Sequence, residues 1–258
     1  MAARIFRSGK LIAHSCAILL AAVLATQPAH SEQGPGHRPE LSLPTLAPLI
    51  KRISPAVVAV AGTRQVPADQ GLVGPGVGFP DAPLPRVEEV SGSGVIVDAG
   101  IGLVITANHV IENAETIAVT LSDGRRVGAI VLAASEDDDL AVLRIAAGGL
   151  TGVSLGDASA LEVGDFVLAI GSPLGLGQSA TFGIVSALHR SSPGIKNAEL
   201  IQIDASIDQG SSGGALINIR GELVGINVAR VGRANGSGFG FAVPADAIRS
   251  LLASIRLG

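Results

Sequence analysis

The sequence predicts an all-β fold of two six-stranded antiparallel barrels followed by a C-terminal helix. After residue 87 the chain settles into short apolar runs of four to eight residues, rich in Val and Ile and separated by turn residues. Such spacing is typical of strands in a barrel or sandwich, and about 12 runs form two groups. Helical periodicity occurs in residues 245–257, where Ile248, Leu251, Leu252 and Ile255 share one face.

The boundary between the two groups is expected in the turn-rich residues 147–156. Residues 49–150 are therefore assigned to the first β-barrel, and residues 151–258 to the second β-barrel and the C-terminal helix. The first group begins with a short helix at 49–53, followed by strands at 56–61, 94–97, 103–106, 117–121, 129–133 and 141–145. The second group contains strands at 166–170, 183–188, 200–203, 215–219, 223–228 and 239–243.

Residues 66–87 are predicted to form a long loop. They contain five prolines and several glycines. Long loops in compact domains are usually functional or disordered. Whether this loop gates a functional site is left open by the sequence.

Residues 1–31 have the pattern of a signal peptide. Three basic residues, Arg4, Arg7 and Lys10, precede an apolar run at 11–25, and small residues follow at 29–31. This order is typical of a cleaved export signal. The run is shorter than the roughly 20 apolar residues that a spanning helix needs. We therefore expect a periplasmic or secreted protein with no membrane attachment after cleavage, beginning with a flexible N-terminal arm at 32–48.

The composition of the chain after residue 31 excludes several classes of function. Cys16, the only cysteine, lies inside the signal, so a disulfide framework, a thiolate metal site and a cysteine nucleophile are excluded. The remaining 15 basic and 22 acidic residues give a formal charge of −7. No basic block or interleaving of basic and aromatic residues occurs, so nucleic-acid binding is not expected. No metal or organic cofactor is predicted.

The sequence GSSGG at residues 210–214 is the strongest indication of chemistry. A serine between glycines can lie on a tight turn whose backbone N–H groups face a developing oxyanion. Ser212 rather than Ser211 is followed by both glycines, so we assign it the nucleophile role. Residues 91–94 (SGSG) are interpreted as a plain turn. The nucleophile elbow of α/β-hydrolases is excluded because that fold places the acid and the histidine after the serine.

A serine nucleophile needs a base, and a carboxylate orients that base. His109 directly follows an apolar strand, whereas His189 precedes a proline in a turn and is expected on the surface. Asp139 adjoins the apolar run 140–145, where a carboxylate can be buried, whereas Asp137 and Asp138 are expected to be solvated. The predicted triad is therefore His109, Asp139 and Ser212.

The order of these three residues, within TANHV, DLAVL and GSSGG, resembles the chymotrypsin-fold peptidases. The similarity is closer to the HtrA (Deg/Do) family of exported bacterial proteases and extends over residues 46–250. Its further motifs are GSGVI at 92–96, GSPLGLG at 171–177, GIVS at 183–186, GELVGIN at 221–227 and GFGFAVP at 238–244.

The resemblance implies a chymotrypsin-like fold and a serine endopeptidase that acts on unfolded or damaged envelope proteins. It also implies an oxyanion hole formed by the backbone N–H groups of Gly210 and Ser212. The primary pocket would be walled by Ile207 and Phe239, with Arg230 at its rim. No aspartate is placed at the pocket base, since Asp208 is expected to point away.

Some family properties are not implied. Ser211 stands where the family usually has Asn. Most members carry PDZ domains after the protease, whereas 14 residues follow Pro244 here. Family trimers often form through aromatic contacts near the N-terminus, and Phe79 is the one aromatic residue available there, so the oligomeric state is left open. Two alternatives also stay open: a protease-fold chaperone or binding module with an idle triad, and an esterase.

Overall fold

The computed structural model describes residues 45–66, 86–172, 177–192, 195–208, 210–228 and 239–255. The predicted signal peptide, most of the predicted arm, most of the 66–87 loop and Arg230 lie outside these ranges. The described residues from Thr45 onward belong to one compact unit.

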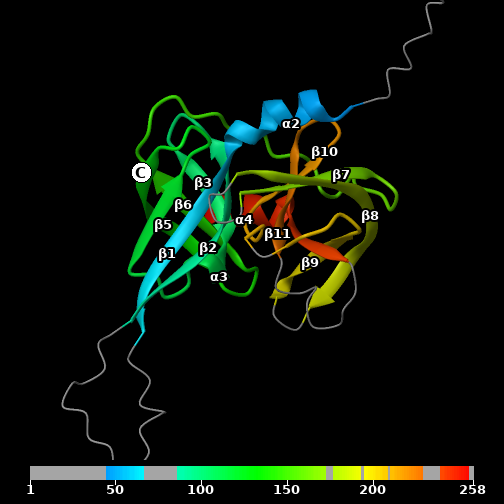
Figure 1. Ribbon diagram of the computed structural model, residues 1–258. Helices are drawn as coiled ribbons and strands as arrows, with labels where there is room; N and C mark the ends of the chain where they lie inside the picture. Colours follow the sequence, from blue (N-terminus) through cyan, green and yellow to red (C-terminus); the bar gives the residue numbers. More distant parts are fainter. Residues whose placement is uncertain are drawn as a thin grey trace, which may run out of the picture. The chain divides into compact units, whose positions relative to one another are not determined.

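Two closed six-stranded antiparallel barrels form the body of the chain, as predicted (Figure 1). The first barrel closes in the order β1-β2-β3-β6-β5-β4. Its strands are β1 (Val57–Val66), β2 (Arg86–Asp98), β3 (Leu103–Ala107), β4 (Thr116–Thr120), β5 (Arg126–Ser135) and β6 (Leu140–Ile145).

The second barrel closes in the order β10-β11-β12-β9-β8-β7. Its strands are β7 (Phe166–Gly171), β8 (Ser179–Ser192), β9 (Ile195–Ile203), β10 (Ala215–Asn218), β11 (Leu223–Val228) and β12 (Gly240–Pro244). The predicted boundary segment 147–156 lies between β6 and β7. Since every strand pairs with two neighbours, neither barrel has a free edge strand.

Within the described residues, four short helical segments accompany the barrels: α2 (Ala47–Ile53), the 3-10 helix η1 (Ser54–Ala56), α3 (Asn108–Ile111) and α4 (Ala245–Ser254). Helix α2 has a proline in its first turn, where the missing N–H costs no hydrogen bond. The guanidinium of Arg52 donates to the carbonyl of Arg220, 2.9 Å away, in the turn after β10. This bond joins the helix ahead of the first barrel to the second barrel.

The core is aliphatic, as the absence of Tyr and Trp requires. All of the largest fully buried side chains are isoleucines and leucines, contributed by strands of both barrels. Full burial of such a side chain stabilises a fold by about 1.5–3 kcal/mol. No helix within the described ranges is both long and apolar enough to cross a membrane.

Residues 91–94 were predicted to form a turn, and this is wrong: they lie within strand β2. Their glycines serve close packing instead. A Cβ on Gly92 would lie 2.6 Å from a methyl group of Val110, and a Cβ on Gly94 would lie 2.8 Å from a methyl group of Val104. The alternation of Ser and Gly therefore marks a strand whose glycine face is tightly covered.

Other element bounds differ modestly from those expected. Strand β1 runs to Val66 and β2 begins at Arg86, so both extend into the predicted loop. Helix α4 ends at Ser254 rather than at residue 257. Strand β12 begins at Gly240, which leaves Phe239 just ahead of it.

Candidate active site

His109 and Asp139 are in direct contact, each at the end of a strand of the first barrel. His109 lies in α3, immediately after β3, and Asp139 lies in the turn before β6. The ring nitrogen Nδ1 of His109 is 2.7 Å from Oδ2 of Asp139. The backbone N–H of His109 also donates to Oδ1 of Asp139, at 2.9 Å. One residue thus engages both carboxylate oxygens and fixes the orientation of the imidazole.

The backbone around Asp139 reinforces this contact. Asp139 has a φ of 52°, in the left-handed region that aspartate tolerates better than most residues. Its carbonyl accepts the N–H of Asn108, at 3.1 Å. The Asp139 side chain is 8% exposed and that of His109 is 20% exposed. The carboxylate is therefore shielded from water while the imidazole retains access to a cleft.

The two preceding aspartates have partners other than His109. Asp138 accepts a hydrogen bond from the hydroxyl of Ser135, and Asp137 pairs with Nζ of Lys196, 2.8 Å away on β9. The hydrogen bond and charge of Asp137 raise the pKa of Lys196. The N–H groups of Lys196 and Asn197 also donate to the Asp137 carbonyl. The acidic turn is thus attached to the second barrel, which helps to position Asp139.

Ser212 lies on a tight turn of the second barrel, with glycines at the strained positions. Gly210 has a φ of 91° and Gly213 a φ of 83°, which glycine adopts without steric cost. The N–H of Ser211 donates to the carbonyl of Asp208, and the N–H of Gly214 donates to the carbonyl of Ser211. Two successive turns therefore bracket Ser212, which is itself 6% exposed.

Asn227 of strand β11 stabilises this turn through hydrogen bonds. The carbonyl of Asn227 accepts the N–H of Gly213, at 2.8 Å, and its N–H donates to the carbonyl of Gly214, at 2.9 Å. The side-chain amide of Asn227 donates to the carbonyl of Ala215. The Asn227 Oδ1 is buried and has no partner among the described residues. A polar residue inside the apolar run 223–228 was the signal that could have identified this support.

The Ser212 turn packs against the segment that carries His109. The N–H of Ser93 donates to the carbonyl of Ser212, at 2.7 Å. A Cβ on Gly92 would touch both that carbonyl and Val110, and a Cβ on Gly213 would lie 2.9 Å from the backbone nitrogen of Ala107. The turn that carries Ser212 therefore adjoins the segment that carries His109, where the two barrels join.

The predicted oxyanion donors, Gly210 and Ser212, belong to the same turn. The N–H groups of the other three residues of the GSSGG sequence are directed to Asp208, Asn227 and Ser211, as described above. The two predicted donors, Gly210 and Ser212, are thus the residues immediately before and after Ser211 in this turn.

Comparison with known proteins bears on this arrangement. The family model for the trypsin-like peptidase domain matches residues 92–226, which include His109, Asp139 and Ser212. Periplasmic pH-dependent serine endoprotease DegQ of Escherichia coli K12 is 45% identical over 221 residues, covering 81% of this chain and 48% of DegQ. Periplasmic serine endoprotease DegP of Salmonella typhimurium LT2 is 39% identical over 239 residues, covering 81% of this chain and 50% of DegP.

A solved structure agrees. The HtrA-type protease AlgW with a decapeptide superposes with a TM-score of 0.68 at 37% identity, covering 82% of this chain and 67% of AlgW. The chain belongs to the HtrA family of trypsin-like serine proteases. The HtrA fold class inferred from the sequence is confirmed, and the chain spans about half the length of the curated relatives it matches.

Some of the residues that the HtrA resemblance predicts for the specificity pocket lie within the described ranges. Ile207 is half-buried, and a Cβ on Gly240 would lie 2.8 Å from two of its side-chain carbons. Ile207 therefore lies against the start of β12, next to Phe239, which is 45% exposed. Asp208 is exposed. Arg230 lies outside the described residues.

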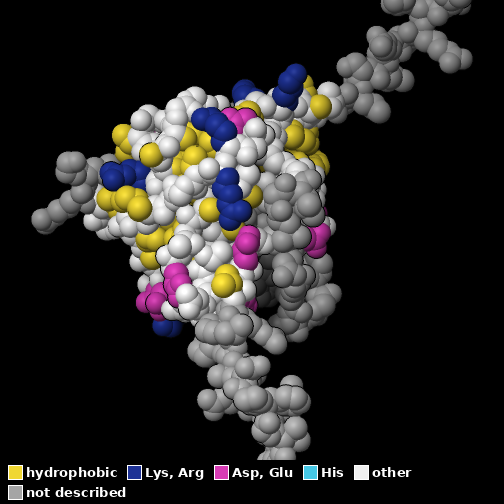
Figure 2. Space-filling model, turned by 60° about the vertical axis from the view of Figure 1, so that its left-hand side comes forward, with side chains coloured by type: hydrophobic (Ala, Val, Ile, Leu, Met, Phe, Trp, Pro, Cys, Tyr) yellow, Lys and Arg dark blue, Asp and Glu magenta, His cyan; other side chains and the backbone are white. Residues whose placement is uncertain are grey.

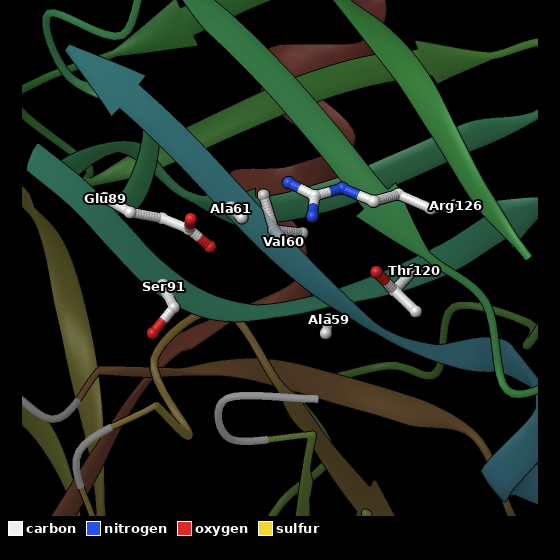
Figure 3. Close-up of a pocket in the computed structure, with 7 residues that line it drawn as sticks. All are labelled: Ala59, Val60, Ala61, Glu89, Ser91, Thr120 and Arg126. Carbon is white, nitrogen blue, oxygen red and sulfur yellow. The ribbon is translucent and has the colours of Figure 1, made fainter. Parts of the chain in front are cut away.

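Two of the hollows on the HtrA chain are lined by described residues. The larger, about 320 Å³, is on the first barrel and is floored by small side chains such as Ala59 and Ala61. Glu89 and Arg126 extend their charged groups over it from opposite sides (Figure 3). It contains no histidine. The smaller, about 210 Å³, is lined by His109 and Asp139. Its described lining also includes Asp137 and Lys196 but not Ser212.

His189 is exposed, as predicted, and its ring nitrogen contacts the carboxylate of Glu199. It lies inside strand β8, however, so its prediction as a turn residue is wrong. Among the described residues, no group of three or more His, Cys, Asp or Glu side chains is arranged to hold a metal ion.

Proposed function

We propose that this HtrA chain is an exported serine endopeptidase that hydrolyses peptide bonds of unfolded or damaged periplasmic proteins. The contact of His109 with Asp139, beside the turn that carries Ser212, is the observation that carries the proposal. A buried carboxylate on the Nδ1 side of an imidazole is the arrangement that makes the other ring nitrogen a base for a serine hydroxyl.

In the proposed reaction, the Ser212 hydroxyl attacks the peptide carbonyl while Nε2 of His109 takes its proton. His109 then delivers that proton to the leaving amine, which departs and leaves an acyl-enzyme. Water, deprotonated by the same imidazole, hydrolyses the ester and regenerates Ser212. Asp139 keeps the imidazole in the required tautomer and stabilises the imidazolium.

The oxyanion of the tetrahedral intermediate would be held by the N–H groups of Gly210 and Ser212. Removing one donor of such a hole lowers kcat by about 10²–10³ in a well-studied protease. Both donors are backbone groups of one turn, so the hole depends on how that turn is held.

The charge distribution supports polypeptide rather than nucleic acid as the substrate. On the face shown in Figure 2, Lys and Arg side chains are scattered, and Asp and Glu side chains lie beside some of them. A phosphate-binding surface would instead gather them in a stripe or patch. The names of DegQ and DegP describe both relatives as periplasmic endoproteases, which supports the same compartment and reaction here.

A chaperone or binding module with an idle triad, and an esterase, are the competing functions. Digestion of casein by the purified protein distinguishes the endopeptidase from both alternatives. The proposal predicts peptide fragments that accumulate with time. An intact casein would contradict it, whether or not simple esters are hydrolysed.

The activity should increase with pH between about 6 and 8, because a histidine must be neutral to accept the proton of a serine. Chelators and thiol reagents should leave the rate unchanged, since the mechanism uses neither a metal nor a thiol. Initial rates of peptide hydrolysis across this pH range, with and without EDTA, provide the measurement. Inhibition by EDTA that added zinc reverses would contradict the mechanism.

Cleavage should follow small aliphatic residues such as Val, Ala or Ile. A pocket walled by Ile207 and Phe239 would be apolar, and Asp208 is exposed rather than buried at a pocket base. Discrimination by one methylene is about 1–3 kcal/mol, so the preference should be graded. Mass-spectrometric mapping of cleavage sites in a denatured protein tests this expectation. A dominant Lys or Arg signature would show that Asp208 lines the pocket.

A further inference from the structure

Ser93 is a buried polar residue at the junction of the two barrels. It lies in the middle of β2, and none of its surface is exposed. The mechanism above gives its side chain no role. A hydroxyl buried this completely in an aliphatic fold needs hydrogen-bond partners.

The partners of the hydroxyl lie in the second barrel. The Ser93 Oγ donates to the carbonyl of Gly210, 2.6 Å away. It also accepts the N–H of Ser172, at 2.8 Å, just after strand β7. Because the N–H of Ser172 occupies one lone pair, the single hydroxyl proton is directed to Gly210. The orientation of this hydroxyl is therefore fixed at both ends.

The backbone of Ser93 contacts the same turn. Its N–H donates to the carbonyl of Ser212, and its carbonyl faces Gly213, where a Cβ would lie only 2.1 Å away. Ser93 thus binds the carbonyls of both Gly210 and Ser212, the two residues whose N–H groups are the proposed oxyanion donors.

The bond to Gly210 matters because glycine adopts both signs of φ readily. The peptide group that joins Gly210 to Ser211 is held at its N–H end by the carbonyl of Asp208. At its C=O end it is held by the Ser93 hydroxyl. With that hydroxyl absent, the backbone at Gly210 would lose a restraint on the conformation that aims its N–H at the oxyanion.

We propose that Ser93 is a positioning residue for the oxyanion hole, acting through its side-chain hydroxyl on the carbonyl of Gly210. The inference rests on the proposed function, since an oxyanion hole has meaning only in an acyl-transfer enzyme. It assigns a catalytic contribution to a residue of the first barrel that touches neither the substrate nor the triad side chains.

The test is Ser93→Ala, with kcat normalised to the number of sites that a fluorophosphonate labels. We expect kcat to decrease by about tenfold to a hundredfold, as for small misplacements of catalytic groups, with KM changed far less. A peptide boronic acid places a negatively charged oxygen in the oxyanion hole. Its affinity should decrease in parallel with kcat, whereas the affinity of an unreactive product peptide should not.

Ser91→Ala is the matched control, because Ser91 lies two residues earlier on the same strand. Its kcat and its boronic acid affinity should stay within about threefold of the wild type.

If Ser93→Ala does not fold, Ser93→Cys carries the same test, since a thiol has similar size but is a weak donor.

Two results would overturn the inference alone: a labelled Ser93→Ala enzyme with wild-type kcat, or a loss of kcat without loss of boronic acid affinity. Both leave the proposed function intact, because they require an active wild type. A wild type that neither hydrolyses casein nor reacts with the fluorophosphonate overturns the proposed function, and this inference with it.

Discussion

Replacement of Ser212 by alanine is expected to abolish peptide hydrolysis and leave the fold intact. Loss of the nucleophile costs about 10⁶ in kcat in a well-studied serine protease. The turn should persist because the bonds that define it use backbone atoms, such as the N–H of Ser93 on the Ser212 carbonyl. The measurement is casein hydrolysis by purified Ser212→Ala, with circular dichroism and thermal unfolding as the check on folding.

Ser211→Ala is the control for this experiment. Ser211 is the neighbouring, equally small serine, and the turn depends on its backbone N–H and C=O rather than on its hydroxyl. We expect it to retain most of the activity. Hydrolysis by Ser212→Ala above a few per cent of the wild-type rate, or inactivation by Ser211→Ala alone, would show that the nucleophile has been assigned wrongly.

Asp139→Asn is expected to lower kcat by about 10⁴ with little change in structure, as for the equivalent change in a known triad. The loss of kcat is expected because the Asp139 carboxylate makes two different contacts with His109. Oδ1 accepts the backbone N–H of His109 and Oδ2 faces Nδ1. An asparagine would keep its oxygen toward the backbone N–H and turn its NH₂ toward Nδ1. The imidazole would then carry its proton on Nε2, where it cannot act as a base.

Single-turnover and steady-state kinetics of Asp139→Asn would measure this loss, and Asp138→Asn is the matched control. Asp138 is bonded to Ser135 rather than to His109, so its variant should keep nearly full activity. An Asp139→Asn enzyme with more than about a tenth of the wild-type kcat would mean that another group orients the imidazole.

The fold could be predicted from the sequence, and the proposed triad could be named from it, because the signals for both are local. Short β-branched runs between turn residues report strands directly. His109 and Asp139 each adjoin an apolar run, so their positions at strand ends could be inferred one at a time, whereas Ser212 was named from the glycines around it. The structure adds the contact of His109 with Asp139, which lie 30 residues apart in the chain.

Residues that join the two barrels were not predictable in this way. Ser93 lies between two glycines, which is typical of a turn, yet the glycines are required by packing against Val104 and Val110. Its partners, Gly210 and Ser172, are 117 and 79 residues away. No periodicity along the chain reports a hydrogen bond between two barrels.

The extent of strand β2 was missed for a different reason. Val87, Glu88 and Glu89 near its start are all exposed, so this part of the strand shows no buried face. The strand continues because it pairs with β1, where Glu88 forms an ion pair with Arg64. Backbone pairing between β1 and β2, rather than burial of side chains, stabilises the start of β2.

The central claim is that Ser212 is a nucleophile activated by His109, and covalent labelling tests it most directly. The wild-type protein would be incubated with a fluorophosphonate at about pH 8, where a catalytic histidine is neutral, then digested and analysed by mass spectrometry. The account predicts one phosphonyl adduct, on Ser212, which disappears when His109 is replaced by alanine. An unlabelled protein that still digests casein, or an adduct on Ser211 that persists in Ser212→Ala, would contradict it.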